Sequence, residues 1–583
     1  MSNPFVSYLN SLHNVSANGT NALAESQAMS DYFPTIYEPF PIVKEVFDLL
    51  TSEAKRVVIL TGHAGDGKST VAIDVLKKLR NIPDHGKLGS PMQVREQIES
   101  AQVSIIKDMS ELSKEERARW LTEAFQQEDS WLIVSNTGPL LSSLLDLALG
   151  RDEQIESKIL SALNEPLELI TTEKHRINGF EKELVIINLT RLDNVELGAS
   201  LVTKLVQHSS WELCNTCQVN LKCPIKKNRD ILLESIETVE ERIRWIYTKL
   251  TAYEHRLTLR QILAHIAYSL TGGESCESAH ESTNSEHALL DILFSEIFFG
   301  YKAGSNCEKA NNLHAISLLR KHQYGAPVGV DFERQLTSST GLDWAILPQE
   351  LLDTTDTWRE RGNDPRGARW RFALRRMNYV FGQPKESKHN ESEYFLTSFL
   401  NSSGVHFFDK WKKLKGLDFT KSEMKKLTDL CLNVILEFFT GFSANQFSGA
   451  GHLFLTLQRK DQNVVQPTQL VIDTLPYKDF DLAYDNIARL PVLRFRKGLA
   501  VLPLSLPLFD YIQSRSKGEL GSSLSPIYQS QIDWFQSELI RVTEAEREQD
   551  DDEITIIKAG INGNVSIHYF SLNSEQTVLE IAI

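Results

Sequence analysis

The stretch VVILTGHAGDGKSTVAIDVL, residues 57–76, decides the fold of this chain. Its first four residues are apolar and predict a buried strand, and the residues from Lys68 onward have the periodicity of a helix. Between them come Gly62, four further residues, and then Gly67, Lys68 and Ser69, which complete the phosphate-binding P-loop pattern. Because a strand before and a helix after are the context that this pattern requires, the stretch predicts a nucleotide-binding α/β core rather than a chance glycine-rich turn.

The spacing of the P-loop follows from the chemistry of phosphate binding. Its glycines allow backbone angles closed to other residues, so that successive N–H groups can surround a phosphate chain at the positive end of a helix. Lys68 is predicted to reach the β- and γ-phosphates, and the Ser69 hydroxyl is predicted to ligate Mg²⁺. The residues predicted to contact ATP are Gly62, His63, Ala64, Gly65, Asp66, Gly67, Lys68, Ser69 and Thr70.

Hydrolysis requires, besides the P-loop, an acidic residue for Mg²⁺ and a group that positions the attacking water. Asp108 ends the run VSIIKD and is predicted to bind Mg²⁺, with Glu111 as the base, although Asp108 is also suited to cap the next helix. Asn136 ends WLIVSN and is predicted to sense the γ-phosphate, or else it begins a turn. Arg260 opens an apolar-striped helix, as a lid arginine or as an ordinary surface arginine.

The bulk composition excludes several classes of protein. The chain has 583 residues, of which 41% are hydrophobic, and this is enough for several cores. Its formal net charge of −15 argues against a generally basic nucleic-acid binder. The first residues lack the pattern of a signal peptide, and no apolar run approaches the roughly 20 residues of a membrane span, so we expect a cytoplasmic protein.

Apolar runs and helical patterns alternate in a way that predicts a P-loop NTPase core of the AAA+/STAND-like kind, with further helices and a β-rich end. Within the end, 491–509 is expected to form strands and AGINGN a hairpin turn; the polar segment 272–287 is expected to be a solvated loop. The predicted segments are a lead-in (1–50), the NTPase core (51–198), a helical lid with a cysteine cluster (199–330), a helical region with an arginine cluster (331–465) and a mixed α/β C-terminal domain (466–583).

Three of the six cysteines, Cys214, Cys217 and Cys223, lie within ten residues in the arrangement C-x₂-C-x₅-C. Thiolates at this spacing suit tetrahedral Zn²⁺ better than an iron–sulfur cluster. Only three ligands are evident, and His208 and Cys276 are candidates for the fourth. The alternative is three reduced cysteines that pack as small hydrophobes in an irregular loop.

The stretch WRERGNDPRGARWRFALRRMNYVF, residues 358–381, combines arginines with interleaved aromatic side chains. Such a patch is suited to grip a phosphate backbone, to supply an arginine to a neighbouring subunit, or to form salt bridges with this protein's own carboxylates. The last interpretation is the default for an acidic chain. The arginines are Arg359, Arg361, Arg366, Arg369, Arg371, Arg375 and Arg376.

Three elements in this order, LTGHAGDGKST, C-x₂-C-x₅-CPIKKN and LTLRQILAHIAYSLTGG, resemble the DptF family. Its members are ATPase components of bacterial restriction systems that work with DNA phosphorothioate modification. The resemblance implies an ATPase that acts with helicase- or nuclease-like partners against DNA lacking the sulfur mark, touching DNA directly or through those partners. It carries over the residues Gly62–Thr70 and the three clustered cysteines, but no nuclease site and no oligomeric state.

The sequence therefore predicts the ATP-hydrolysing subunit of an antiviral defence complex, with ATP and Mg²⁺ as its ligands and Zn²⁺ as a third ligand if the cysteines bind metal and do not simply pack. ATP is favoured over GTP because the stretch INLTRLD around Asn188 lacks the lysine of a guanine-reading N-K-x-D motif. The rival hypothesis is a nucleotide-dependent switch or scaffold with protein partners only and little turnover.

Overall fold

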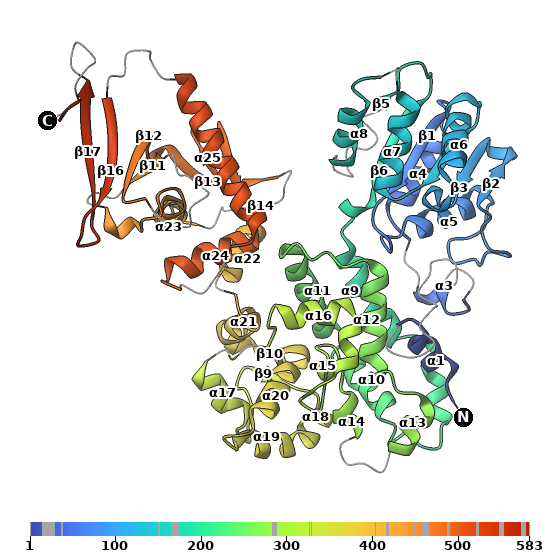
Figure 1. The fold of residues 1–583 in the computed structure, drawn as a ribbon. Helices are drawn as coiled ribbons and strands as arrows, with labels where there is room; N and C mark the ends of the chain where they lie inside the picture. The colour runs from blue at the N-terminus through green and yellow to red at the C-terminus, as the bar shows by residue number, and fades with distance from the viewer. Residues whose placement is uncertain are drawn as a thin grey trace. The chain divides into compact units, whose positions relative to one another are not determined.

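The computed structural model describes residues 2–13, 30–36, 39–149, 152–164, 175–282, 288–325, 327, 329–402, 404–414, 419–447, 451–456, 466–486, 490–519, 524–546, 553–572 and 579–581. The chain divides into two compact units, Met1–Asn401 and Ser402–Ile583, which are described separately (Figure 1). The finer boundaries after residues 50, 198, 330 and 465 stay predictions.

The first unit begins with a six-stranded sheet in the order β2-β3-β4-β1-β6-β5. The four central strands are parallel, and each edge strand is antiparallel to its neighbour. This confirms the predicted α/β class and the strand predicted before the P-loop, and it makes strands of the apolar runs that precede Asp108 and Asn136. The strands are β1 (Arg56–Thr61), β2 (Arg95–Ile98), β3 (Val103–Ile106), β4 (Ser130–Val134), β5 (His175–Arg176) and β6 (Glu183–Asn188).

Helices cover both faces of this sheet because its central strands are apolar on both sides. In β1, Val58 and Leu60 pack with α4 (Ile42–Thr51) and α5 (Lys68–Leu79). Their neighbours Val57 and Ile59 point the other way and pack with α6, α7 and α8. The bounds of those three helices are Lys114–Gln126, Thr137–Ala148 and Ile155–Asn164. All six residues of β1 are buried, so the strand that carries the P-loop lies at the centre of the core.

The rest of the first unit is mostly helical (Figure 1). Its longer helices are α9 (Asn194–Val206), α10 (Pro224–Glu234), α11 (Ile236–Ala252), α12 (Leu259–Thr271), α16 (His314–Lys321), α19 (Asp356–Asn363), α20 (Ala368–Phe381) and α21 (His389–Ser398). The shorter elements are α1 (Pro4–Ser11), α3 (Phe33–Ile36), α13 (Cys276–Glu281), α14 (Ala288–Ile292), α15 (Phe294–Ile297), α17 (Val330–Leu336), α18 (Gln349–Thr354), and strands β7 (Tyr301–Lys302), β8 (Ser305–Asn306), β9 (Ala345–Ile346) and β10 (Gln383–Pro384).

The expectation of a solvated loop over 272–287 is wrong for the part that forms α13. Ser275 caps this helix, its side chain accepting from the Ser278 N–H while Ser278 reaches back to the Ser275 N–H. Two serines three residues apart thus make a capping box in a stretch whose polarity indicated a loop. Residues 283–287 lie outside the described part of the chain.

The second unit contains a five-stranded sheet, β11-β12-β16-β17-β18, and a three-stranded sheet, β13-β14-β15. Helices α23 and α25 lie beside strands β11 and β12 (Figure 1). The AGINGN hairpin is confirmed, since β16 and β17 pair from Ala559 opposite Val565. The elements are α22 (Val405–Leu414), α23 (Lys421–Thr440), β11 (His452–Thr456), β12 (Thr468–Pro476), β13 (Phe480–Asp485), β14 (Leu490–Phe495), β15 (Ala500–Pro503), α24 (Leu506–Ser516), α25 (Pro526–Glu546), β16 (Glu553–Ala559), β17 (Val565–Leu572) and β18 (Leu579–Ile581).

The prediction of strands over 491–509 holds for β14 and β15 and is wrong for its last residues, which begin α24. Ser505 precedes this helix and Pro507 lies in its first turn. Proline in a first turn costs no hydrogen bond, because the N–H groups there have no partner within the helix.

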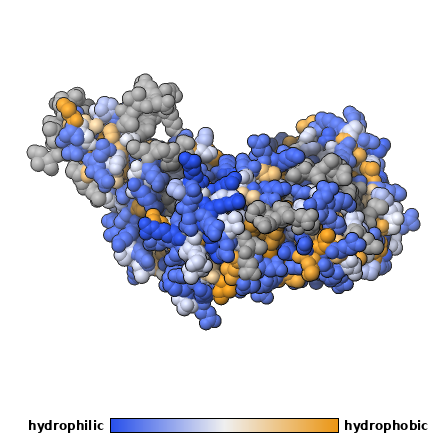
Figure 2. All heavy atoms as spheres, turned by 90° about the horizontal axis from the view of Figure 1, so that it is seen from below, coloured by the Kyte–Doolittle hydropathy of each residue, from blue (hydrophilic) through white to orange (hydrophobic). Residues whose placement is uncertain are grey.

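The face of the molecule in Figure 2 is predominantly hydrophilic, with hydrophobic residues in small patches. Among the described residues, none of the helices combines the length and the apolar character that crossing a bilayer demands.

Candidate functional site

The carboxyl ends of the parallel strands meet at one edge of the sheet, and the predicted site residues follow them. Strand β1 leads into the P-loop, β3 into Asp108 and β4 into Asn136. Strand β4 lies between the other two. Its register with β1 places Val134 beside Leu60, so Asn136 emerges next to the P-loop. Side chains from segments far apart in sequence are thereby brought to one place.

The P-loop has the backbone conformation that its glycines were predicted to allow. Gly65 and Gly67 have φ values of 92° and 91°, in the left-handed region that side chains disfavour. Gly67 is the N-cap of α5, so Lys68 is the first residue of that helix. A Cβ at Gly67 would also lie 2.5 Å from the Phe40 ring. His63 and Ala64 are exposed, and Ser69 and Thr70 are half-buried.

Lys68 lies at the centre of the site and is 6% exposed. Its Nζ donates to Gly62 O at 2.9 Å, to His63 O at 2.8 Å and to Asn136 Oδ1 at 3.0 Å. Burial lowers the pKa of Lys68; the carboxylates of Asp66 and Asp108 oppose that shift, and the Arg260 guanidinium adds to it. An ammonium held by neutral oxygens beside another cation is poised to exchange those oxygens for an anion.

The side chain and the backbone of Asn136 make different contacts. Its amide oxygen accepts from Lys68, and its backbone N–H donates to Ser110 Oγ at 2.7 Å. Asn136 also precedes α7 as the N-cap, but its side chain makes no capping bond. The side chain is therefore directed at the lysine, while the backbone begins helix α7 and not the turn of the alternative interpretation.

The structure confirms the helix-capping interpretation of Asp108. Asp108 Oδ1 accepts from the Ser110 N–H at 2.8 Å and so caps the short helix Met109–Glu111, yet its charge also acts on Lys68. Glu111 is exposed and, within the described ranges, makes no hydrogen bond or ion pair. The Mg²⁺ role of Asp108 and the base role of Glu111 stay predictions.

Arg260 lies at the P-loop and not on an outer surface. The N-terminus of α12 contacts the loop, since a Cβ on Gly65 would lie 2.8 Å from Thr258 Oγ1 and 3.5 Å from Arg260 Cβ. Burial lowers the pKa of Arg260. In the described part of the chain its guanidinium has no hydrogen bond and no ion pair. A half-buried cation without a counter-ion beside Lys68 favours an anionic ligand.

A second arginine of this segment, Arg256, has no signal in the sequence that marks it as a site residue. It forms an ion pair with Asp66 and donates from Nη2 to Leu189 O at 3.0 Å and Leu192 O at 3.2 Å. Asp66, fully buried, also accepts from the His63 N–H at 2.8 Å. Asp66 therefore braces the loop and does not face a ligand. The one local signal in this region was T-x-x-Q from Thr258, which marks the start of α12.

Replacing Arg256 with alanine is expected to lower the free energy of unfolding of the first unit by about 1–3 kcal/mol. The reason is that the buried Asp66 carboxylate loses its counter-ion. Chemical denaturation measures the change, and Arg244→Ala, which removes more exposed ion pairs with Glu196 and Glu240, is the control. Adding Asp66→Asn should restore part of the loss; an equal loss in both arginine variants would contradict the role of the brace.

Of the two candidates for a fourth metal ligand, Cys276 lies close to the cysteine cluster and His208 is bound to other groups. Asn3 Nδ2 donates to Cys214 Sγ at 3.2 Å, and Asn3 N donates to Cys276 Sγ at 3.3 Å. Burial raises the pKa of Cys276, and the thiols of Cys214 and Cys223 raise it further. His208 is engaged elsewhere, since its Nε2 contacts Thr35 Oγ1 and its Nδ1 accepts from the Ser210 N–H.

Three members of the arginine cluster form ion pairs with this protein's own carboxylates. Arg359 pairs with Asp356, Arg375 with Glu333 and Arg376 with Glu296. Others of the cluster, Arg361 and Arg369, lie over the Trp370 ring at 5.0 and 4.6 Å. For these three arginines, the structure confirms the interpretation that the cluster forms salt bridges with the protein's own carboxylates.

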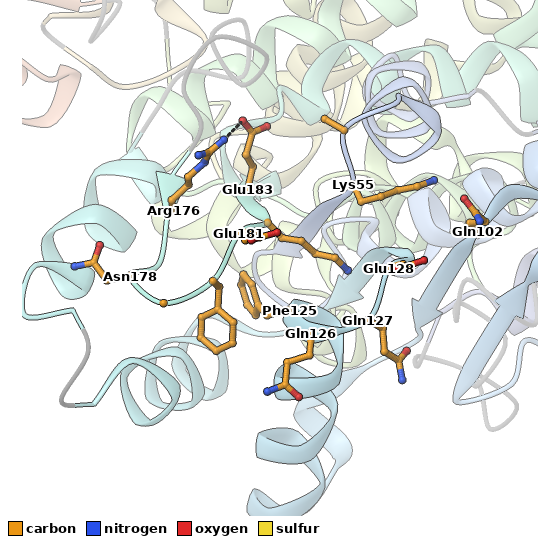
Figure 3. Close-up of a pocket in the computed structure, with 14 residues that line it drawn as sticks. Lys55, Gln102, Phe125, Gln126, Gln127, Glu128, Arg176, Asn178, Glu181 and Glu183 are labelled. Atoms are coloured by element: carbon orange, nitrogen blue, oxygen red, sulfur yellow. Dashed lines mark hydrogen bonds and ion pairs between the residues drawn. The ribbon is translucent and has the colours of Figure 1, made fainter.

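A separate cavity of about 1170 Å³ lies at the opposite edge of the sheet, where the parallel strands begin (Figure 3). Lys55, Gln102 and Glu183 line it just before or at the start of β1, β3 and β6. Figure 3 shows Arg176 turned toward Glu183, with which it pairs at 3.4 Å. Lys182 Nζ likewise donates to Ala124 O at 2.7 Å. Arg176 and Lys182 are thus bound to protein groups, and Lys55 is a further cation that lines this cavity.

Comparison of this chain with protein-family models, with curated proteins and with solved structures gives no match.

Proposed function

We propose that this chain binds and hydrolyses ATP as the motor subunit of a bacterial DNA restriction complex that acts on DNA lacking backbone phosphorothioate. One observation carries the nucleotide part of the proposal. The Lys68 ammonium, the Asn136 amide and the Arg260 guanidinium, which has no ion pair within the described ranges, meet at a glycine loop that begins a helix. These are the groups that phosphoryl transfer requires around a γ-phosphate.

Each residue has a distinct part in this proposal. Lys68 exchanges its contacts with Gly62 O and His63 O for phosphate oxygens. Asn136 orients the attacking water and Arg260 balances charge on the γ-phosphate. Mg²⁺, which would be held by the Ser69 hydroxyl and Asp108, supplies further charge neutralisation. The core is then an AAA+/STAND-like NTPase in which α12 belongs to the lid.

The restriction context rests on the order of three sequence elements: the P-loop, the cysteine element and the α12 segment. Their resemblance to DptF implies helicase- or nuclease-like partner subunits, and DNA contact made directly or through them. Exposed arginines such as Arg361, Arg366 and Arg369 are available for a phosphate backbone. Purification of the native complex tests this part, because the co-purifying subunits are then identified directly.

A nucleotide-dependent switch with little turnover is the second candidate, and a specific observation favours it. Glu111 is exposed, and one carboxylate oxygen of Asp108 already accepts a hydrogen bond from the Ser110 N–H. Without a positioned base, hydrolysis would be slow even if ATP binds tightly. Phosphate release with and without DNA separates the two functions. Turnover that rises with DNA supports the motor; a retained nucleotide with negligible turnover supports the switch.

Replacing Arg260 with alanine is expected to slow hydrolysis by about 10²-fold. It should also weaken the binding of ATP more than the binding of ADP, because the guanidinium acts on the γ-phosphate. Calorimetry with both nucleotides measures the difference. Arg244→Ala, on the neighbouring helix α11, is the matched control and should leave both affinities unchanged. Equal weakening of ATP and ADP would show that Arg260 does not sense the γ-phosphate.

A further inference from the structure

Three segments distant in sequence meet around the clustered thiols: the chain start at Asn3, the loop 214–223 and helix α13. Cys217 lies 3.4 Å from His280 Nε2 of α13, and the Cys217 N–H donates to Cys214 O at 3.2 Å, closing the C-x₂-C turn. Cys223 is the N-cap of α10, and Cys276 is the first residue of α13. All four thiols are free and half-buried.

Asn3 gives this cluster the character of a ligand site. It is 5% exposed and directs two N–H donors at two sulfurs, Cys214 Sγ and Cys276 Sγ. Its side-chain oxygen is used separately, accepting from the Phe5 N–H at 3.0 Å to cap α1. N–H donors aimed at sulfur favour the thiolate over the thiol, and such outer contacts typically orient metal-bound ligands.

As the side chains stand, no three His, Cys, Asp or Glu among the described residues are arranged as a metal-binding group. The sulfurs would have to turn toward one another on binding. Cysteine side chains can turn in this way by changing rotamer. The fold brings the four cysteines into one neighbourhood: Asn3 contacts the sulfurs of both Cys214 and Cys276, and Cys223 lies close enough to interact electrostatically with Cys214, Cys217 and Cys276.

We propose that Cys214, Cys217, Cys223 and Cys276 bind one Zn²⁺ and that Asn3 is a positioning residue of this site. Four thiolates complete the tetrahedron that structural zinc prefers. His208 is excluded as the fourth ligand because both of its ring nitrogens have partners. Zinc would fasten α1 and α13 to the loop between α9 and α10, and this holds whether or not the P-loop hydrolyses ATP.

Elemental analysis of the full-length protein, purified without metal-affinity resin, tests the site. We expect about one zinc per chain in the wild type and in His208→Gln, and loss of zinc in Cys276→Ser. Cys307→Ser, which removes a half-buried thiol of the same unit, is the matched control and should keep its zinc. Zinc retained in Cys276→Ser but lost in His280→Ala would overturn the assignment of Cys276, and iron in place of zinc would overturn the metal.

Two further measurements keep the proposal testable if Cys276→Ser fails to fold. Chelator treatment of the wild-type chain should expose additional thiols to a thiol reagent, and Co²⁺ added afterwards should give the absorption of cobalt bound to thiolates. Asn3→Ala should lower the affinity for the metal by about 10- to 100-fold while leaving the stoichiometry at one metal per chain. A chain that takes up neither Zn²⁺ nor Co²⁺ would leave four reduced thiols and no metal site.

Discussion

Lys68→Ala is expected to lower the rate of ATP hydrolysis by about 10³-fold and to weaken Mg²⁺–ATP binding. The ammonium is buried and touches the loop carbonyls of Gly62 and His63 and the amide of Asn136. Its removal takes away a cation that stabilises the negative charge developing on the phosphates. Phosphate release and calorimetry measure the two effects.

Lys78→Ala is the matched control for this experiment. Lys78 lies on the same helix, α5, but near its far end, where it pairs with Asp84 at 3.2 Å while one third of its side chain stays exposed. An exposed pair of this kind contributes little, so both hydrolysis and stability should stay near the wild-type values. If Lys68→Ala hydrolyses ATP as fast as Lys78→Ala does, the measured turnover belongs to another protein or another site.

Arg376→Ala is expected to be the most destabilising single substitution considered, at about 3–5 kcal/mol. Arg376 holds Glu296 through two bonds of 2.6 and 2.9 Å, and the two side chains are only 4% and 0% exposed. Glu296 also accepts from the Gly304 N–H. Removing the guanidinium leaves a buried carboxylate without a counter-ion, which costs far more than the pair itself contributes. Chemical denaturation of the full chain measures the loss.

Two further variants show whether the buried charge causes the loss of stability. Arg361→Ala removes an exposed arginine of the same cluster that lies over the Trp370 ring, so its cost should stay below about 1 kcal/mol. In Arg376→Ala combined with Glu296→Gln, the buried charge is gone and part of the stability should return. A double variant no more stable than the single one would mean that packing of the arginine stem, and not the charge, dominates.

The sequence located the core strands and the P-loop correctly because each depends on neighbouring residues. A run such as VVIL buried on both faces has one structural interpretation, and the glycine spacing is local. Asn136 was also accessible to prediction, since it follows the next apolar run. Where a local pattern was ambiguous, prediction failed: SLPLF alternates like a strand, yet Pro507 occupies the first turn of α24.

Contacts across long sequence separations could not be predicted in this way. Asp66 and Arg256 are 190 residues apart, and neither neighbourhood indicates the other. Asn3 and Cys276 are separated by 273 residues, so the contact of the chain start with the cysteines emerged only from the fold. Cys276 had been one candidate among two, and it was the position of α13 that distinguished it from His208.

Helix α12 connects the two regions discussed above. Its first turn abuts Gly65 of the P-loop, and at its other end Thr271 Oγ1 donates to Asn10 Oδ1 of α1 at 2.6 Å. A thirteen-residue helix is stiff and about 20 Å long, so it moves as a rod rather than bending. If a triphosphate displaces Arg260, the C-terminal end of α12 should therefore move with it and change the contact with α1. Slower amide exchange in Pro4–Ser11 on adding ATP would show this change.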